Sequence, residues 1–168
     1  MHHKVFRRLI SHLSKTPWTI RKHFSNASLD RIERAIQMSE RSHTGQIRFI
    51  VESDLHPIDI LGKKTPNKRA MELFAQMGIW DTEQNNGVLI YLLLADKDVE
   101  IVADRGIHNL VGESGWHSIC VEMESHFCKG DFEEGVLFGI KKIGGLMALH
   151  FPSDGDHVNE LPDKPLVI

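Results

Sequence analysis

The sequence predicts an α/β fold: a three-layer α/β/α sandwich around a small mixed sheet that contains a β-hairpin. The first observation is the apolar run of residues 88–94, whose β-branched and aromatic content indicates a strand buried on both faces. The second is a strand–helix–strand order over residues 46–94, which is typical of a parallel βαβ unit. The third is the charged stretch Asp96-Lys97-Asp98 before residues 99–103, which indicates a hairpin turn between two strands.

A basic segment begins the chain. Residues 1–24 contain six Lys and Arg residues and neither Asp nor Glu. Apolar residues recur at helical spacing, which predicts a short amphipathic helix that ends near Pro17 and a second helical turn that starts there. Such a segment could lie on an anionic lipid surface or an acidic partner, or it could pack against the domain with its basic face in water.

The other elements follow from apolar spacing, helix caps and glycines. We first expect a helix over residues 29–43 with Ser28 as its N-cap and a strand over 46–51. A helix over 67–77 should begin at Thr65-Pro66 and turn Ala70, Met71, Phe74 and Met77 inward. A short turn or helix over 107–111, a helix over 116–129, and a helix over 132–149 capped by Asp131 should follow.

The composition fits one folded domain with two flanking segments. The chain has 168 residues, of which 41% are hydrophobic and 26% charged, enough for one well-buried core and short for two. We expect a basic amphipathic helical segment over residues 1–27, the α/β domain over 28–150, and an extended, acidic, Pro-containing tail over 151–168.

Charge and cysteine usage limit the classes of function. A formal net charge of −3 argues against nucleic-acid binding, which needs a positive field. No apolar run of about 18 residues occurs, and the first residues lack a signal-peptide core, so we expect a cytoplasmic protein that is at most peripheral to a membrane. Cys120 and Cys128 lie about 12 Å apart along one predicted helix, too far for a disulfide, and we expect both to be buried free thiols.

The combination of an Asn-Asn-Gly turn, two strands and a Gly-containing turn resembles the TPM domain family, named for a thylakoid-lumen phosphatase-like protein, a photosystem repair factor and a receptor modulator. The resemblance covers about residues 28–150, and the whole chain looks most like the bacterial soluble branch of the family. It implies an α/β/α sandwich around a mixed sheet, binding of a divalent cation such as calcium and, for the plant member, acid phosphatase activity. The residues that carry it are Asn85-Asn86-Gly87, Asp104-Arg105-Gly106, His150-Phe151-Pro152 and Asn159-Glu160-Leu161-Pro162.

A polar corner is expected where the hairpin brings two segments together. Antiparallel pairing of the last two strands should place Asn85 and Asn86 near Asp104. With Asp81 and Thr82 they supply the oxygen atoms that calcium prefers, so Asp81, Asn85, Asn86 and Asp104 are the predicted metal ligands. The alternative is that both Asn residues only form a turn, that Asp81 caps a turn, and that Asp104 pairs with a basic side chain.

Two further side chains flank the corner, and a second candidate end of the sheet exists. Arg105 could hold a phosphate oxygen, and Trp80 could line a ligand rim or only cover the core.

Ligands of parallel sheets often bind beyond the carboxyl ends of the strands. Those ends carry Glu52 and Asp54 after the first strand and Asp96 and Asp98 after the second, although a charged hairpin usually faces solvent.

Three functions are compatible with these residues. The first is a non-enzymatic, divalent-cation-binding interaction or accessory module that meets a membrane surface or a membrane-anchored protein through residues 1–24. The second is a metal-assisted acid phosphatase acting on phosphomonoesters, with Asp81 and Asp104 holding the cation and Arg105 orienting the phosphate. The third is a structural partner with no ligand. No organic cofactor is expected, since no Gly-rich phosphate loop occurs, and no zinc or nucleophile motif is present.

Overall fold

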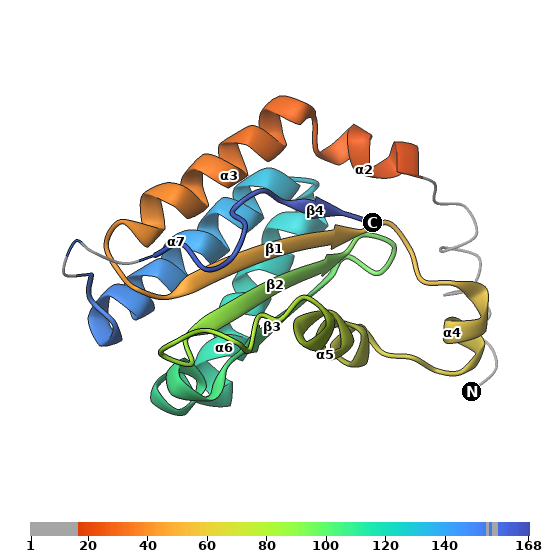
Figure 1. Cartoon of the computed structure of the whole chain (residues 1–168). Coiled ribbons are helices and arrows are strands. Elements are labelled where there is room, and N and C mark those ends of the chain that lie inside the picture. Colours follow the sequence, from red (N-terminus) through yellow and green to blue (C-terminus); the bar gives the residue numbers. More distant parts are fainter. Residues whose placement is uncertain (1–16, 154, 156–157) are drawn as a thin grey trace.

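The central layer is a four-stranded mixed sheet. The computed structural model describes residues 17–153, 155 and 158–168. β1 runs parallel to its neighbours β2 and β4, whereas β2 pairs antiparallel with β3, so the predicted βαβ unit and hairpin are confirmed. The sheet has the order β3-β2-β1-β4 (Figure 1), with β1 at Gln46–Glu52, β2 at Gly87–Leu93, β3 at Asp98–Ala103 and β4 at Leu166–Val167.

Helices cover both faces of the sheet, which confirms the three-layer sandwich. One apolar cluster lies between the sheet and α3, α6 and α7, and the other lies between the sheet and α5 (Figure 1). β2 is buried along its whole length because alternate residues enter the two clusters, Ile90 the first and Tyr91 the second. The helices are α2 (Pro17–His23), α3 (Asn26–Glu40), α4 (Pro57–Leu61), α5 (Pro66–Gln76), α6 (Arg105–Lys129) and α7 (Phe132–His150).

The helix α6 joins two predicted segments. It runs through residues 107–111 and 116–129 with a kink at Gly112, whose φ of +74° is unfavourable for residues other than glycine. Asp104 is the N-cap of this helix, and its side chain accepts a hydrogen bond from the backbone N–H of Arg105. The hairpin and the start of α6 are therefore directly connected through Asp104.

Four side chains differ from the sequence-based expectation. Ser25, not Ser28, caps α3, because its hydroxyl accepts the N–H of Ser28. Met71 and Met77, which we expected to face inward, are 57% and 41% exposed, and Leu73 packs in their place. Cys128 is exposed rather than buried, while both cysteines are free as expected. The cap lies three residues earlier than expected, and the Met and Cys differences concern which face of a helix is buried.

The C-terminal segment, expected to be an extended tail, adds a strand to the sheet. Leu166–Val167 pairs with β1, and the guanidinium of Arg48 donates to the carbonyl oxygens of Lys164, at 2.6 Å, and Pro162. The segment has few local signals for a strand. Its position depends on the unpaired edge of β1, which offers backbone hydrogen-bonding groups to a distant part of the chain.

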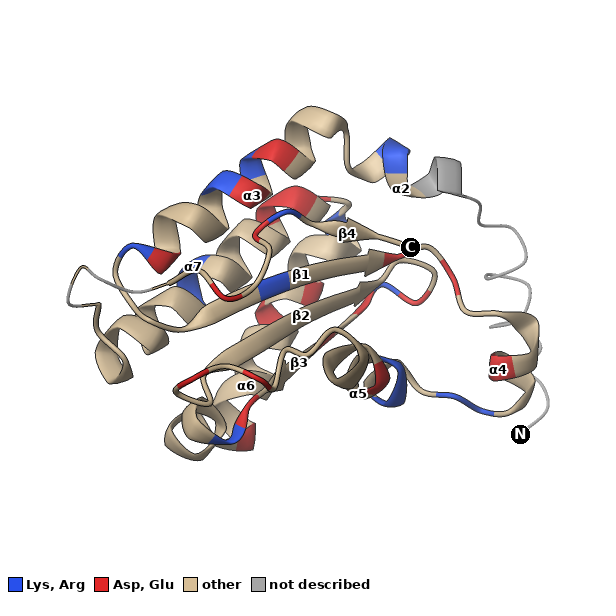
Figure 2. Ribbon diagram, in the orientation of Figure 1, with Lys and Arg blue, Asp and Glu red and all other residues tan. Residues whose placement is uncertain are grey.

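The described part of the chain begins with α2. The amphipathic helix predicted before Pro17 lies outside the described residues. In α2, Arg21 and Lys22 are exposed while Ile20 is buried, and α3 carries interspersed acidic and basic side chains (Figure 2). Across residues 17–153, 155 and 158–168, every helix is too short or too polar to cross a membrane.

Candidate functional site

The backbone of the two predicted segments meets at the polar corner. The N–H of Asp104 donates to the carbonyl oxygen of Gly87 at 2.9 Å, and the N–H of Ile107 donates to that of Asn85 at 3.4 Å. The turn before β2 therefore lies against the junction of β3 and α6. The predicted proximity of Asn85 and Asp104 is confirmed at the level of the backbone.

Two glycines of the motif make close backbone contacts at the corner. A Cβ atom added to Gly87 would lie 2.0 Å from the carbonyl oxygen of Ile79, and one added to Gly106 would lie 2.5 Å from that of Asn85. Both contacts are with backbone atoms, which cannot rotate away. Gly106 therefore lets the Asp-Arg-Gly turn touch the Asn-Asn-Gly turn, whereas Gly87 lets the start of β2 pack against Ile79.

We therefore expect Gly87→Ala to lower the free energy of unfolding by about 2–3 kcal/mol, the cost of overpacking a buried site. Urea denaturation measures this difference. Gly145→Ala is the matched control, since a Cβ there meets nothing within 4 Å and alanine improves the propensity of α7. Equal stability of the Gly87 variant and the wild type would contradict the close packing of the corner.

Asn86 and Asp104 each bury an oxygen that has no hydrogen-bond partner among the described residues. Asn86 is 0% exposed, and its Nδ2 donates to Thr44 Oγ1 at 3.2 Å while its Oδ1 has no donor. The hydroxyl of Thr44 in turn donates to Gln84 Oε1 at 2.8 Å. Asp104 is 6% exposed, with Oδ1 bonded to the Arg105 N–H at 2.6 Å and Oδ2 without a donor.

The other predicted site residues are placed differently. Asp81, Arg105 and Trp80 are exposed, Trp80 to 53%, and they form the outer surface beside the corner. Asn85 is half-buried with a φ of +53°, which fits its alternative interpretation as a turn residue. Thr82 is buried and its Oγ1 accepts the N–H of Asn86 at 3.0 Å. The structure thus brings Asn86 and Asp104 into the protein and leaves Asp81 in solvent.

Sequence reasoning missed Gln46, which lies in register with Gly87 on β1. Its Oε1 accepts the N–H groups of Glu160 and Leu161, both at 2.9 Å, while its buried Nε2 has no acceptor among the described residues. A glutamine at the start of a buried strand was the only available signal. Gln46 fixes the C-terminal segment beside the corner.

The described residues of the corner include few candidate metal ligands. Within the described part of the chain, no group of three or more His, Cys, Asp or Glu side chains could hold a metal ion. A cation at the corner would take one carboxylate and one amide oxygen, from Asp104 and Asn86, and complete its shell with carbonyl groups or water.

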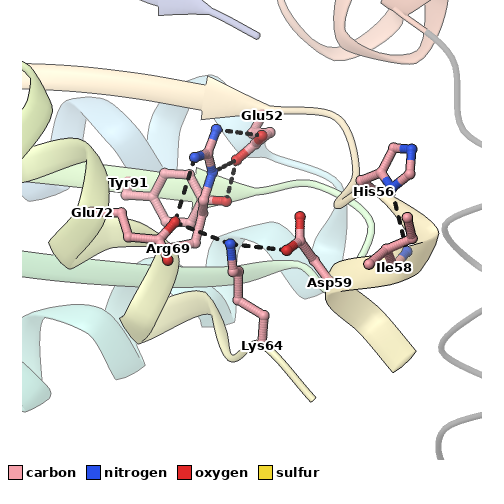
Figure 3. A network of polar contacts seen from close by, with 8 residues as sticks. All are labelled: Glu52, His56, Ile58, Asp59, Lys64, Arg69, Glu72 and Tyr91. Carbon is pink, nitrogen blue, oxygen red and sulfur yellow. Dashed lines mark hydrogen bonds and ion pairs between the residues drawn. The ribbon is translucent and has the colours of Figure 1, made fainter. Parts of the chain in front are cut away.

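The second candidate end of the sheet forms a network of side-chain contacts around Glu52 (Figure 3). Glu52 is 8% exposed and receives two hydrogen bonds from Arg69, at 2.9 and 3.0 Å, and one from the hydroxyl of Tyr91, at 2.7 Å. Burial raises the pKa of Tyr91 further above its usual value, so the phenol stays protonated and donates. Both carboxylate oxygens of Glu52 are therefore satisfied by the protein itself.

The network continues to the surface through alternating charges. Glu72 lies between Arg69 and Lys64, at 3.7 and 3.1 Å, and Lys64 reaches Asp59 in α4 at 2.9 Å (Figure 3). The hydrogen bond with Lys64 lowers the pKa of Asp59. This end of the sheet connects α4 and α5 to β1 and has its charges paired, which favours a structural role over ligand binding.

A model of the TPM domain matches residues 21–146, more than half of the chain. The chain belongs to the TPM domain family. The resemblance found in the Asn-Asn-Gly and Asp-Arg-Gly turns is thereby confirmed, and the polar corner is formed by the very residues that carry it. The predicted placement in the bacterial soluble branch stays a prediction.

Solved structures support the same conclusion. This TPM domain resembles the NMR structure of the BA42 protein from the psychrophilic bacterium Bizionia argentinensis, with 29% identity and a TM-score of 0.76 over 86% of this chain and 95% of that one. It also shares its fold with the N-terminal domain of a P. gingivalis protein, with 19% identity and a TM-score of 0.62 over 80% of this chain and 82% of that one. Among curated proteins, none matches the chain.

Proposed function

We propose that this TPM domain is a non-enzymatic accessory module that binds a divalent cation, with calcium as the best fit, at the polar corner. The observation that supports this proposal is the pair of buried oxygens, Asn86 Oδ1 and Asp104 Oδ2, that have no donor among the described residues. A buried acceptor without a partner costs about 1–3 kcal/mol, more when it is charged. A cation coordinated by both groups would remove that cost.

Calorimetric titration of the protein with calcium and with magnesium tests the proposal. We expect saturable heat for the wild type and its loss in Asp104→Asn, because the substitution removes the only buried carboxylate of the corner. Asparagine is itself a good N-cap, so α6 should keep its start. Bound calcium should also raise the melting temperature of the wild type, since a ligand of the folded state stabilises it.

Asp131→Asn is the matched control for this titration. Asp131 is the N-cap of α7, is exposed, and makes no side-chain capping bond. The same change of charge at a helix start should therefore leave calcium binding unchanged. Absence of saturable heat in the wild type, or equal binding by Asp104→Asn, would refute the site.

The alternative, a metal-assisted acid phosphatase, needs Asp81 and Asp104 to share a cation. The exposure of Asp81 favours the binding module over this alternative. Hydrolysis of an aryl phosphate by the wild type that is lost in both Asp81→Ala and Arg105→Ala would reverse this preference. The membrane surface or membrane-anchored partner expected for residues 1–24 stays a prediction, since most of that segment lies outside the described residues.

A further inference from the structure

A groove with a volume of about 370 Å³ runs along the outer side of β3, one of the two edge strands of the sheet. Four consecutive residues of β3, residues 98–101, form one wall. The opposite wall is one face of α6, with positions 113, 116, 117, 120, 121 and 124 at helical spacing. A groove between an edge strand and a helix has the shape that accepts an extended polypeptide segment.

The charged side chains that line this groove are acidic. Asp98 and Glu100 come from β3, and Glu113 and Glu124 come from α6, whereas neither Lys nor Arg is among the lining residues. The Cys120 thiol adds no charge, because burial raises its pKa to about 12. The groove is thus complementary to a cationic ligand.

The groove lining also includes apolar side chains and a donor without an acceptor. Val99 and Ile101 from β3 and Val121 from α6 provide surface for the aliphatic stems of long side chains. Trp116 lines the groove, is 4% exposed, and its indole N–H has no acceptor among the described residues. A buried indole N–H normally has a partner, and a peptide carbonyl oxygen would supply one.

We propose that this groove binds an extended segment of a partner protein that carries Lys or Arg side chains. The carboxylates of Glu113 and Glu124 pair with its cationic groups, and a backbone carbonyl of the segment accepts the indole N–H of Trp116. The proposal uses neither Asn86 nor Asp104. The proposed peptide binding would therefore still stand if no cation bound at the polar corner, and the cation site would still stand if no peptide bound in the groove.

Fluorescence anisotropy with a short labelled peptide of alternating Lys and Val tests the groove. We expect saturable binding of this peptide and none of a Glu–Val peptide of the same length. Glu113→Gln/Glu124→Gln should weaken binding about tenfold or more, because two charge pairs are lost. Glu113 is exposed and Glu124 is half-buried, and circular dichroism checks that the variant is folded.

Glu122→Gln/Glu134→Gln is the matched control, because both residues are exposed, lie outside the groove lining and change the net charge equally. Its affinity should stay within about twofold of the wild type, as expected for exposed charges outside the groove. Equal weakening by the two double variants would reduce the interaction to general charge attraction and overturn the proposal. Complete displacement of the Lys–Val peptide by spermidine at matched charge would overturn the proposal as well, since the peptide backbone would then contribute nothing to the affinity.

The indole N–H signals in a ¹H–¹⁵N spectrum give a second measurement. Trp116→Phe assigns the Trp116 signal, which should move downfield when the Lys–Val peptide is added, because a new hydrogen bond deshields the proton. Trp80, which is exposed and does not line the groove, should not move. A peptide that binds without shifting the Trp116 signal would overturn the proposed position of the segment.

Discussion

Replacing Arg69 by Met is expected to lower the free energy of unfolding by about 3–5 kcal/mol, as is typical when one partner of a buried ion pair is removed. Met keeps most of the aliphatic stem but not the guanidinium that donates two hydrogen bonds to Glu52. Glu52 is 8% exposed and would lose two of its three hydrogen bonds. Urea denaturation monitored by circular dichroism measures the loss.

Arg31→Met is the control for Arg69→Met, because it removes an equivalent Arg–Glu pair at the surface. Arg31 pairs with Glu133, and its side chain is 54% exposed, so water replaces the guanidinium when it is lost. We expect a much smaller change for this variant. Glu52→Gln combined with Arg69→Met should recover part of the stability, since the uncompensated charge is then gone. Equal losses in the two single Arg variants would contradict the buried network.

The strands and the hairpin could be predicted from the sequence because their signals are local. Residues 88–94 are continuously apolar, and a charged turn separates them from the next strand. The meeting of Asn85 with Asp104 follows from hairpin geometry alone, so half of the polar corner was predictable. The exposure of the Asp81 side chain was not predictable, because its direction depends on a turn whose exact conformation no periodicity specifies.

The remaining features depend on contacts between distant segments. Glu52, Arg69 and Tyr91 come from β1, α5 and β2, and no local pattern marks a glutamate at a strand end as the centre of a network. The same holds for Arg48, which binds carbonyl groups more than a hundred residues away. Such pairings become visible only when the sheet order is known, since strand order decides which chain ends are neighbours.

A second large effect on stability is expected when the pH is changed through the range in which Glu40 titrates. This residue ends α3, is 5% exposed, and accepts the N–H of Ile47 at 2.8 Å. Burial, opposed by that hydrogen bond and reinforced by the Asp163 carboxylate, raises the pKa of Glu40 to about 8. The folded protein therefore holds a proton on Glu40 at a pH where the unfolded chain has released it.

Stability should fall as the pH rises through this range. Between about pH 4.5, the usual value for the carboxyl group, and pH 8, the folded state binds one proton more than the unfolded state, so the unfolding free energy decreases with pH. The decrease is complete above the folded-state pKa. At roughly 1.4 kcal/mol per pKa unit, it amounts to a few kcal/mol.

Glu40→Gln should remove this pH dependence, because glutamine keeps an acceptor for the Ile47 N–H and carries no titrating proton. We expect the variant to be more stable than the wild type at about pH 9 and similar to it near pH 5. Asp163→Asn should shift the decrease to lower pH, since it removes one charge that raises the pKa of Glu40. Parallel stability profiles for the wild type and Glu40→Gln would refute the protonated carboxyl group.

The same titration should act on the C-terminal strand. Arg48 holds this segment through the Pro162 and Lys164 carbonyl groups, so a charged Glu40 beside Asp163 adds repulsion at the point where the segment is fixed. The N–H of Ile168 donates to Val51 at 2.9 Å and reports on this strand. At about pH 9 the amide hydrogen exchange of Ile168 should be faster in the wild type than in Glu40→Gln. Equal exchange rates would show that the C-terminal strand does not respond to the titration of Glu40.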